Sequence, residues 1–117
     1  MTEHNWGSVL TLGVEEELML VDAESHDLAP AIDEVLPLVD GDRRYSRELR
    51  PAQLEIITPV CTTAADACRE LVAVRRHLIG RLDGAYRLLA SGTHPSSTSH
   101  GPITAAERYR RIADEYV

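Results

Sequence analysis

The stretch LTLGVEEELMLVD, residues 10–22, places three consecutive glutamates inside an otherwise apolar segment. Apolar side chains recur at every second position, which predicts a β-strand running from Val9 to Val21. A period of two puts Glu15 and Glu17 side by side on one face, and puts Glu16 on the apolar face opposite. A buried carboxylate costs several kcal/mol unless a cation or hydrogen-bond donors compensate it. We therefore expect either a solvated edge or a positive charge beside this strand.

A second strand is expected at AQLEIITPV, residues 52–60, where Pro59 closes it. Its apolar Leu54 and Ile56 share one face, and Glu55 lies in the middle of the other face. Carboxylate oxygens suit hard divalent cations, and Mg²⁺ usually takes one or two of them and keeps several waters. The candidate metal ligands are therefore Glu15, Glu17 and Glu55. A solvated acidic strand face is the alternative, because glutamates are common on exposed surfaces.

Two helices are predicted in the second half of the chain, each beginning with a capping-box pattern. The first covers residues 64–83, with Thr63 and Asp66 as the capping pair and an apolar stripe at helical spacing. The second begins near Thr104, which is paired with Glu107, and continues to the end of the chain.

Shorter elements complete the pattern. We expect a short helix over residues 31–39 that Pro37 ends or kinks, a polar connection over 41–51, a strand over 85–92 and a small-residue loop over 93–102. A chain of 117 residues is long enough for one small domain with one continuous core. This mixture of strands and helices predicts an α+β fold.

The composition excludes some kinds of chemistry. The formal net charge is −7, which argues against a sequence-independent nucleic-acid binder and favours cations or cation-bridged substrates. All twelve basic residues are arginine, so neither a Schiff-base lysine nor a P-loop lysine can come from these residues. A GC-rich genome would also explain the absence of lysine.

The cysteines and the N-terminal sequence indicate the cellular compartment of the protein. Cys61 and Cys68 do not form a disulfide framework and have no histidine at metal-ligand spacing, so we expect small buried thiols. The polar start MTEHNWGS lacks a signal-peptide pattern, and the apolar runs are too short to span a membrane. These features predict a soluble, cytoplasmic protein with no membrane contact.

Histidines give weaker indications of a site. His94 lies in SGTHPSS after the expected strand, and loops at strand ends often carry functional residues. A histidine that structures the turn before Pro95 is the equally supported alternative. His77 falls among the polar positions of the first predicted helix, so we expect it to be solvated.

Four segments together resemble a known family. In chain order they are GVEEELMLVD, QLEIITPVC, ASGTHP and ITAAERYRRIADEY. Their sequence is similar to that of the type 2 glutamate–cysteine ligases, the bacterial carboxylate–amine ligases, from about Leu12 to Val117. The resemblance implies a glutamine synthetase-like fold, in which an antiparallel sheet forms a cradle with helices packed behind it. The family's catalytic domain is longer than this chain, and the last predicted helix has no stop signal. We therefore expect residues 1–117 to be the N-terminal part of a single catalytic domain, which is incomplete and inactive alone.

The resemblance also implies an activity. Such enzymes use ATP and Mg²⁺ or Mn²⁺ to phosphorylate a glutamate side-chain carboxylate, and an amino acid or amine acceptor then attacks the acyl phosphate. Glu15, Glu17 and Glu55 would be metal ligands, whereas the catalytic residues stay unassigned. The candidate substrate-binding residues are Glu48, Arg50, Thr93 and His94. No nucleic-acid partner is expected, and a homo-oligomer is left open. The alternative is a non-catalytic α+β module that pairs with a partner chain through an open sheet edge.

Overall fold

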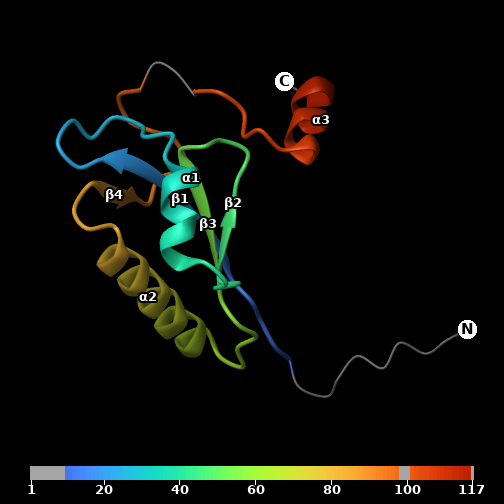
Figure 1. Ribbon diagram of the computed structural model, residues 1–117. Helices are drawn as coiled ribbons and strands as arrows, with labels where there is room; N and C mark the ends of the chain where they lie inside the picture. The colour runs from blue at the N-terminus through green and yellow to red at the C-terminus, as the bar shows by residue number, and fades with distance from the viewer. Residues whose placement is uncertain (1–9, 98–100, 117) are drawn as a thin grey trace, which may run out of the picture.

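The computed structural model describes residues 10–97 and 101–116. Within these ranges the chain forms a four-stranded antiparallel sheet with the strand order β2-β3-β1-β4 (Figure 1). The strands are β1 (Glu15–Asp22), β2 (Tyr45–Arg47), β3 (Gln53–Ile57) and β4 (Tyr86–Leu89). The helical segments are α1 (Ile32–Val35), the 3₁₀ helix η1 (Leu36–Val39), α2 (Ala64–Arg81) and α3 (Glu107–Tyr116). The α+β prediction is confirmed.

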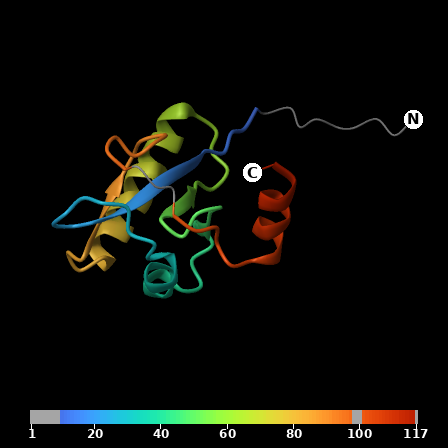
Figure 2. The same cartoon turned by 90° about the horizontal axis from the view of Figure 1, so that it is seen from above.

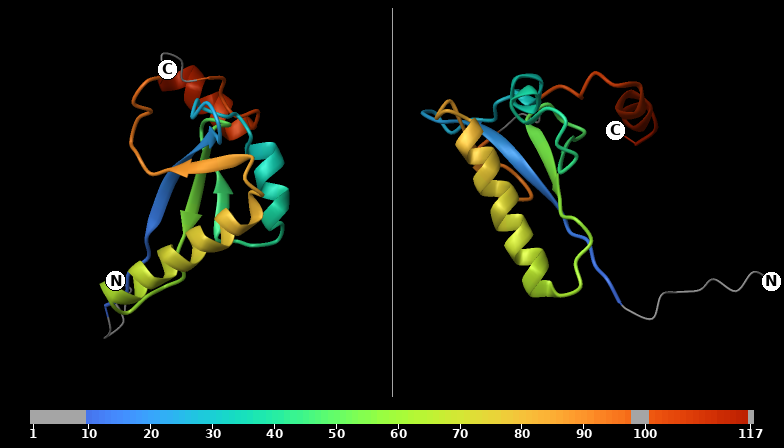
Figure 3. Two further views of the ribbon diagram at one scale, coloured as in Figure 1. Left: turned by 90° about the vertical axis from the view of Figure 1, so that its left-hand side faces the viewer. Right: turned by 60° about the horizontal axis from the view of Figure 1, so that its bottom comes forward.

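One face of the sheet is buried under helices, and we call it the covered face. Leu18 and Leu20 of β1 and Leu54 of β3 point to this face and are at most 1% exposed. They belong to one core cluster with α1, η1 and α2, and Figure 3 shows α2 lying along the sheet. Full burial of a leucine side chain contributes about 1.5–3 kcal/mol, so this face supplies most of the fold's hydrophobic stabilisation.

The other face, here called the open face, carries the odd-numbered positions of β1. It presents Glu15, Glu17 and Met19 of this strand, with Gln53 and Glu55 of β3 beside them. Figures 2 and 3 show that α3 lies on this side of the sheet, opposite α2. The predicted alternation is confirmed for β3 and for the first half of β1, whereas Met19 and Val21 are buried although they lie on the open face. Both strands are shorter than the predicted ranges 9–21 and 52–60.

The start of α2 follows the predicted capping pattern. The Asp66 amide donates to Thr63 Oγ1 at 3.1 Å, and the Thr63 hydroxyl donates to Asp66 Oδ2 at 2.6 Å. The expected short helix also forms, and Pro37 lies where α1 gives way to η1. Proline at the start of a helical segment is tolerated because its missing N–H would have no partner there.

Among the helices of the described ranges, none combines the length and apolar character needed to cross a bilayer.

The polar connection over residues 41–51 was predicted wrongly, because it contains the edge strand β2. Tyr45 anchors this strand from the covered face, where its hydroxyl lies 2.9 Å from the carbonyl oxygen of Val74 and 2.8 Å from His77 Nδ1. His77 is therefore hydrogen-bonded and only partly exposed, which corrects the expectation of a solvated side chain.

Two further expectations are wrong. The last helix begins at Glu107, and the hydroxyl of Thr104 donates to the carbonyl oxygen of Glu48 at 2.7 Å instead of capping the helix. Cys68 is exposed on α2, whereas Cys61 is buried as expected, and both are free thiols. The Thr104 contact joins residues 56 positions apart, which neighbouring residues cannot reveal, whereas Cys68 lies beside the buried Ala67 on the exposed side of α2.

Candidate functional site

Three polar side chains form a row across the open face. Glu17 of β1 lies directly opposite Glu55 of β3, and Glu55 lies directly opposite Ser46 of β2. The Ser46 hydroxyl donates to Glu55 Oε2 at 3.1 Å. Directly opposed residues on antiparallel strands have Cβ atoms about 4.5–5.5 Å apart, so the two carboxylates face each other at close range. We call Glu17, Glu55 and Ser46 the acidic row.

The electrostatics of the acidic row favour a cation. Partial burial raises the pKa of the Glu17 carboxyl above its usual value, and the nearby charges of Glu48 and Glu55 raise it further. Repulsion between carboxylates disfavours their charged forms, and a bound cation would remove that repulsion. Glu48, just before β3, therefore lies within electrostatic reach of the row.

The other two glutamates of the triplet have different surroundings. Glu15 is exposed and lies on the open face opposite Ile57, one pleat beyond Glu17. Glu16 lies on the opposite face, as predicted, and Arg75 of α2 binds it through two hydrogen bonds. The Arg75 Nε donates to Glu16 Oε2 at 2.8 Å. Glu16 is thus neutralised by the protein itself, which leaves Glu15 and Glu17 for the open face.

The donor set fits a hard divalent cation in part. Over residues 10–97 and 101–116, no group of three or more His, Cys, Asp or Glu side chains is arranged to hold one ion. The opposed carboxylates of Glu17 and Glu55 could offer two oxygen ligands, the number that proteins usually contribute to an Mg²⁺ or Mn²⁺ coordination shell. The assignment of Glu15, Glu17 and Glu55 as three ligands stays a prediction.

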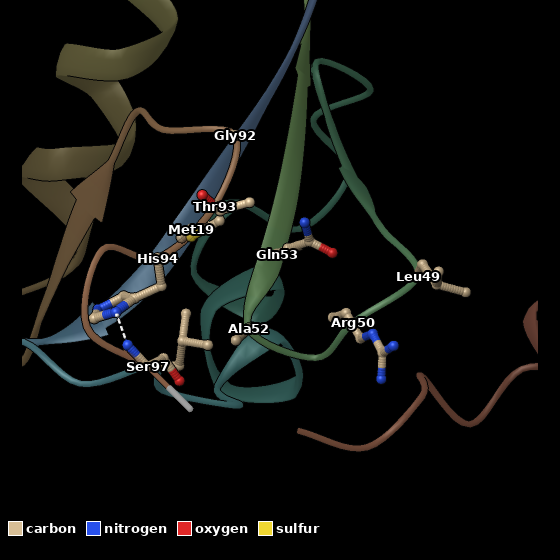
Figure 4. A pocket seen from close by; sticks show the side chains of 10 residues that line it. Met19, Leu49, Arg50, Ala52, Gln53, Gly92, Thr93, His94 and Ser97 are labelled. Atoms are coloured by element: carbon tan, nitrogen blue, oxygen red, sulfur yellow. Dashed lines mark hydrogen bonds between the residues drawn. The ribbon is translucent and has the colours of Figure 1, made fainter. Parts of the chain in front are cut away.

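A cavity of about 260 Å³ is lined by Met19 and Gln53, each two residues along its strand from Glu17 or Glu55. Figure 4 shows the residues around it. Arg50, Thr93 and His94, three of the four predicted substrate-binding residues, line it. Met19 and Gln53 line both this cavity and a neighbouring hollow of about 280 Å³ that reaches Glu17. The structure therefore brings these predicted residues together next to the candidate metal ligands.

His94 structures the loop that lines one side of the cavity. Its Nδ1 accepts hydrogen bonds from the backbone amides of Ser96 at 3.3 Å and Ser97 at 2.9 Å. Its Nε2 donates to the carbonyl oxygen of His26 at 2.8 Å, because Nδ1, as the acceptor, cannot carry the proton. Both ring nitrogens are thus used within the protein, which is the turn-structuring role that the sequence left open.

Of the two candidates that precede β3, Arg50 lines the cavity and Glu48 does not. Glu48 Oε2 accepts a hydrogen bond from the Leu49 amide at 2.6 Å, and Arg50 Nη1 donates to the carbonyl oxygen of Gly101 at 2.8 Å. Sequence reasoning missed Ser46 as part of the row and Tyr109 as its neighbour. Ser46 carried no signal because its strand was not predicted, and Tyr109 comes from a helix distant in sequence.

Comparisons with known proteins show the family of the chain. The model of the family described as Glutamate-cysteine ligase family 2 matches residues 11–117. The chain belongs to that family. It is 38% identical over 111 residues to "Putative glutamate–cysteine ligase 2-3" of Rubrobacter xylanophilus. That alignment covers 90% of this chain and 30% of the relative. It is 41% identical over 113 residues to "Putative glutamate–cysteine ligase 2-1" of the same organism, covering 90% of this chain and 29% of the relative.

A third relative comes from a different genus. The chain is 38% identical over 109 residues to "Putative glutamate–cysteine ligase 2-1" of Saccharopolyspora erythraea, covering 92% of this chain and 29% of the relative. The chain thus spans about 30% of the length of the curated relatives that it matches.

Proposed function

We propose that this chain supplies part of the active site of an ATP- and Mg²⁺-dependent carboxylate–amine ligase of the glutamate–cysteine ligase type. The observation that carries the proposal is the opposition of Glu17 and Glu55 on the open face, beside a cavity lined by Arg50. Membership of glutamate-cysteine ligase family 2 supports the reaction class. The names of the relatives support the same class.

The proposed reaction has two steps. The terminal phosphoryl group of ATP is transferred to an oxygen of the glutamate side-chain carboxylate, which gives an acyl phosphate and ADP. The amine of the acceptor then attacks the acyl carbon, loses a proton and displaces inorganic phosphate, so that an amide bond forms. Both reactants of the first step are anions, and a divalent cation offsets their repulsion and holds the phosphoryl group in line.

The residues have separate proposed roles. Glu17 and Glu55, with Glu15 as the predicted third ligand, hold Mg²⁺ or Mn²⁺ from rigid strands, which fix a ligand better than loops do. Arg50 and Thr93 face substrate from the cavity, since a guanidinium and a hydroxyl both bind a carboxylate well. His94 positions the loop that carries Thr93.

The fold supports a glutamine synthetase-like cradle. The support comes from an antiparallel sheet with α1, η1 and α2 packed on one face and carboxylates on the other. Because the chain spans about 30% of its relatives' length, we propose that further strands and the remaining ATP contacts belong to the longer enzyme, and that this chain alone is inactive. A coupled assay that detected ATP- and glutamate-dependent turnover by the 117 residues would contradict this part.

A metal titration tests the site itself. Calorimetric titration with Mn²⁺ should show saturable binding, and Glu17→Gln or Glu55→Gln should weaken it about tenfold or more, since losing even an outer-sphere partner of a metal costs about 10–100-fold. Glu24→Gln, which changes an exposed turn, is the matched control and should bind like the wild type. If both site variants kept the wild-type affinity, the assignment would be wrong.

A further inference from the structure

The C-terminal arm, which we define as residues 101–116, is attached to the segment that precedes β3. Three consecutive carbonyl oxygens of that segment accept hydrogen bonds from the arm. The Tyr109 hydroxyl donates to Arg47 at 2.7 Å, the Thr104 hydroxyl to Glu48 at 2.7 Å, and the Thr104 amide to Leu49 at 2.8 Å. Arg50 completes the contact through its guanidinium, which donates to the carbonyl oxygen of Gly101.

Burial identifies the two residues on which this contact depends. Thr104 is 4% exposed and Tyr109 is 8% exposed. Tyr109 is the buried residue of α3, a helix that Figure 1 shows standing away from the sheet. A buried carbonyl group needs a hydrogen-bond partner, and these two side chains supply partners for the carbonyls of Arg47 and Glu48.

The contact adjoins the acidic row along β2, because Arg47, whose carbonyl oxygen accepts the Tyr109 hydrogen bond, directly follows Ser46. Burial raises the pKa of the Tyr109 hydroxyl, and the charges of Glu48 and Glu55 add to the increase. The same two carboxylates act on Glu17. Tyr109 and Glu17 are therefore within electrostatic reach of the same pair of charges.

We propose that Thr104 and Tyr109 are positioning residues, which fix the backbone of residues 47–49 and thereby hold the Glu48 carboxylate beside the acidic row and Arg50 at the cavity. The hydrogen-bonded contact stands on its own geometry. Its consequence for cation binding rests on the function proposed above. Neither residue touches the cation or the substrate in this proposal.

The first measurement tests the contact without any metal. Tyr109→Phe and Thr104→Val remove one donor hydroxyl each and keep the side-chain shape, and Tyr116→Phe, at a site 76% exposed on the same helix, is the control. The amide of residue 104 should exchange with solvent about threefold to tenfold faster in Tyr109→Phe, which is the scale of one lost neutral hydrogen bond. Tyr116→Phe should leave that rate unchanged. Equal rates in the wild type and Tyr109→Phe would overturn the proposed contact.

The second measurement tests the positioning role. Mn²⁺ affinity should fall about threefold to tenfold in Tyr109→Phe and in Thr104→Val, with the thermal unfolding midpoint of the core recorded to exclude a general loss of fold. Faster exchange with unchanged Mn²⁺ affinity would overturn the positioning role. If the wild type bound no Mn²⁺ at all, the proposed metal function would fail, and the contact would still be judged by the exchange rates.

Discussion

On the covered face of the sheet, Glu16 is bound by Arg75 of α2, whereas on the open face the next residue, Glu17, lies opposite a second carboxylate. Within the described residues, neither Glu17 nor Glu55 forms an ion pair with an arginine or histidine. The two neighbouring glutamates therefore differ in their electrostatic surroundings: Arg75 offsets the charge of Glu16, whereas Glu55 repels the charge of Glu17. Glu16 links β1 to α2 through Arg75, and Glu17 faces Glu55, as the proposed cation site requires.

The largest effect is expected from a test of the two faces as packing surfaces. Leu54→Ala removes a fully buried side chain from the covered face and should lower the free energy of unfolding by about 2–5 kcal/mol. Gln53→Ala, the adjacent residue on the open face, should change it by no more than about 0.5 kcal/mol. Urea unfolding of both variants measures the difference, and similar losses would contradict the division of the sheet into two faces.

A pH scan compares Asp42, a carboxylate whose charge is offset by Arg44, with Glu17, a carboxylate that lies near other negative charges. The hydrogen bond from the Arg44 guanidinium lowers the pKa of Asp42 to about 2. A lowered pKa in the folded state gives stability that is present above the ordinary aspartate value of about 3.9 and is lost as the pH falls toward 2. Relative to Asp42→Asn, the wild type should therefore lose an advantage of about 1–2 kcal/mol over this range. A constant difference would show that the bond to Arg44 does not control this group.

Glu17 should respond with the opposite sign. Burial and the charges of Glu48 and Glu55 raise its pKa, so its charged form destabilises the folded state at neutral pH. This destabilisation should disappear as the pH falls through the folded-state pKa of Glu17 to below the ordinary pKa of a glutamate side chain. The same urea series, extended to Glu17→Gln, should show the variant's advantage shrinking under acid.

The ion pair on the covered face should matter less than the core. Arg75→Ala leaves Glu16 without its partner and should lower the free energy of unfolding by about 1 kcal/mol, because the ion pair is bidentate but still partly exposed. Arg76→Ala, at the exposed next position of α2, should cost less than about 0.5 kcal/mol. Equal costs for the two arginines would remove the distinction drawn between Glu16 and Glu17.

Periodicity explains which parts of this molecule could be predicted. The alternation of β1 and β3 and the apolar stripe of α2 are local patterns, so the elements and the separation of Glu16 from Glu17 followed from them. The position of Glu55 opposite Glu17 did not, because strand register depends on contacts between segments far apart in the chain. The chemistry of carboxylates grouped Glu55 with Glu15 and Glu17 as candidate ligands, and the resemblance to a family supported that grouping, but neither gave the register.

The missed features share a physical cause. Strand β2 has three residues and holds its place through Tyr45, whose partners come from α2. Thr104 and Tyr109 bind carbonyls 56 and 62 residues earlier in the chain, and His94 binds a carbonyl 68 residues away. A single polar side chain carries no periodic signal, so contacts of this kind appear only in the folded molecule.

The smallest effect gives the sharpest comparison of the two glutamates. At neutral pH, Glu16→Gln should destabilise the protein because it weakens the bond to Arg75, whereas Glu17→Gln should stabilise it by about 0.2–1 kcal/mol because it removes a like-charge pair across the strands. Saturating Mg²⁺ should then stabilise the wild type and Glu16→Gln by mass action, and should lose most of this effect in Glu17→Gln. Thermal unfolding with and without the ion measures both signs. If Glu17→Gln destabilised the chain as Glu16→Gln does, the open-face carboxylates would not repel each other, and the case for a cation between them would lose its electrostatic basis.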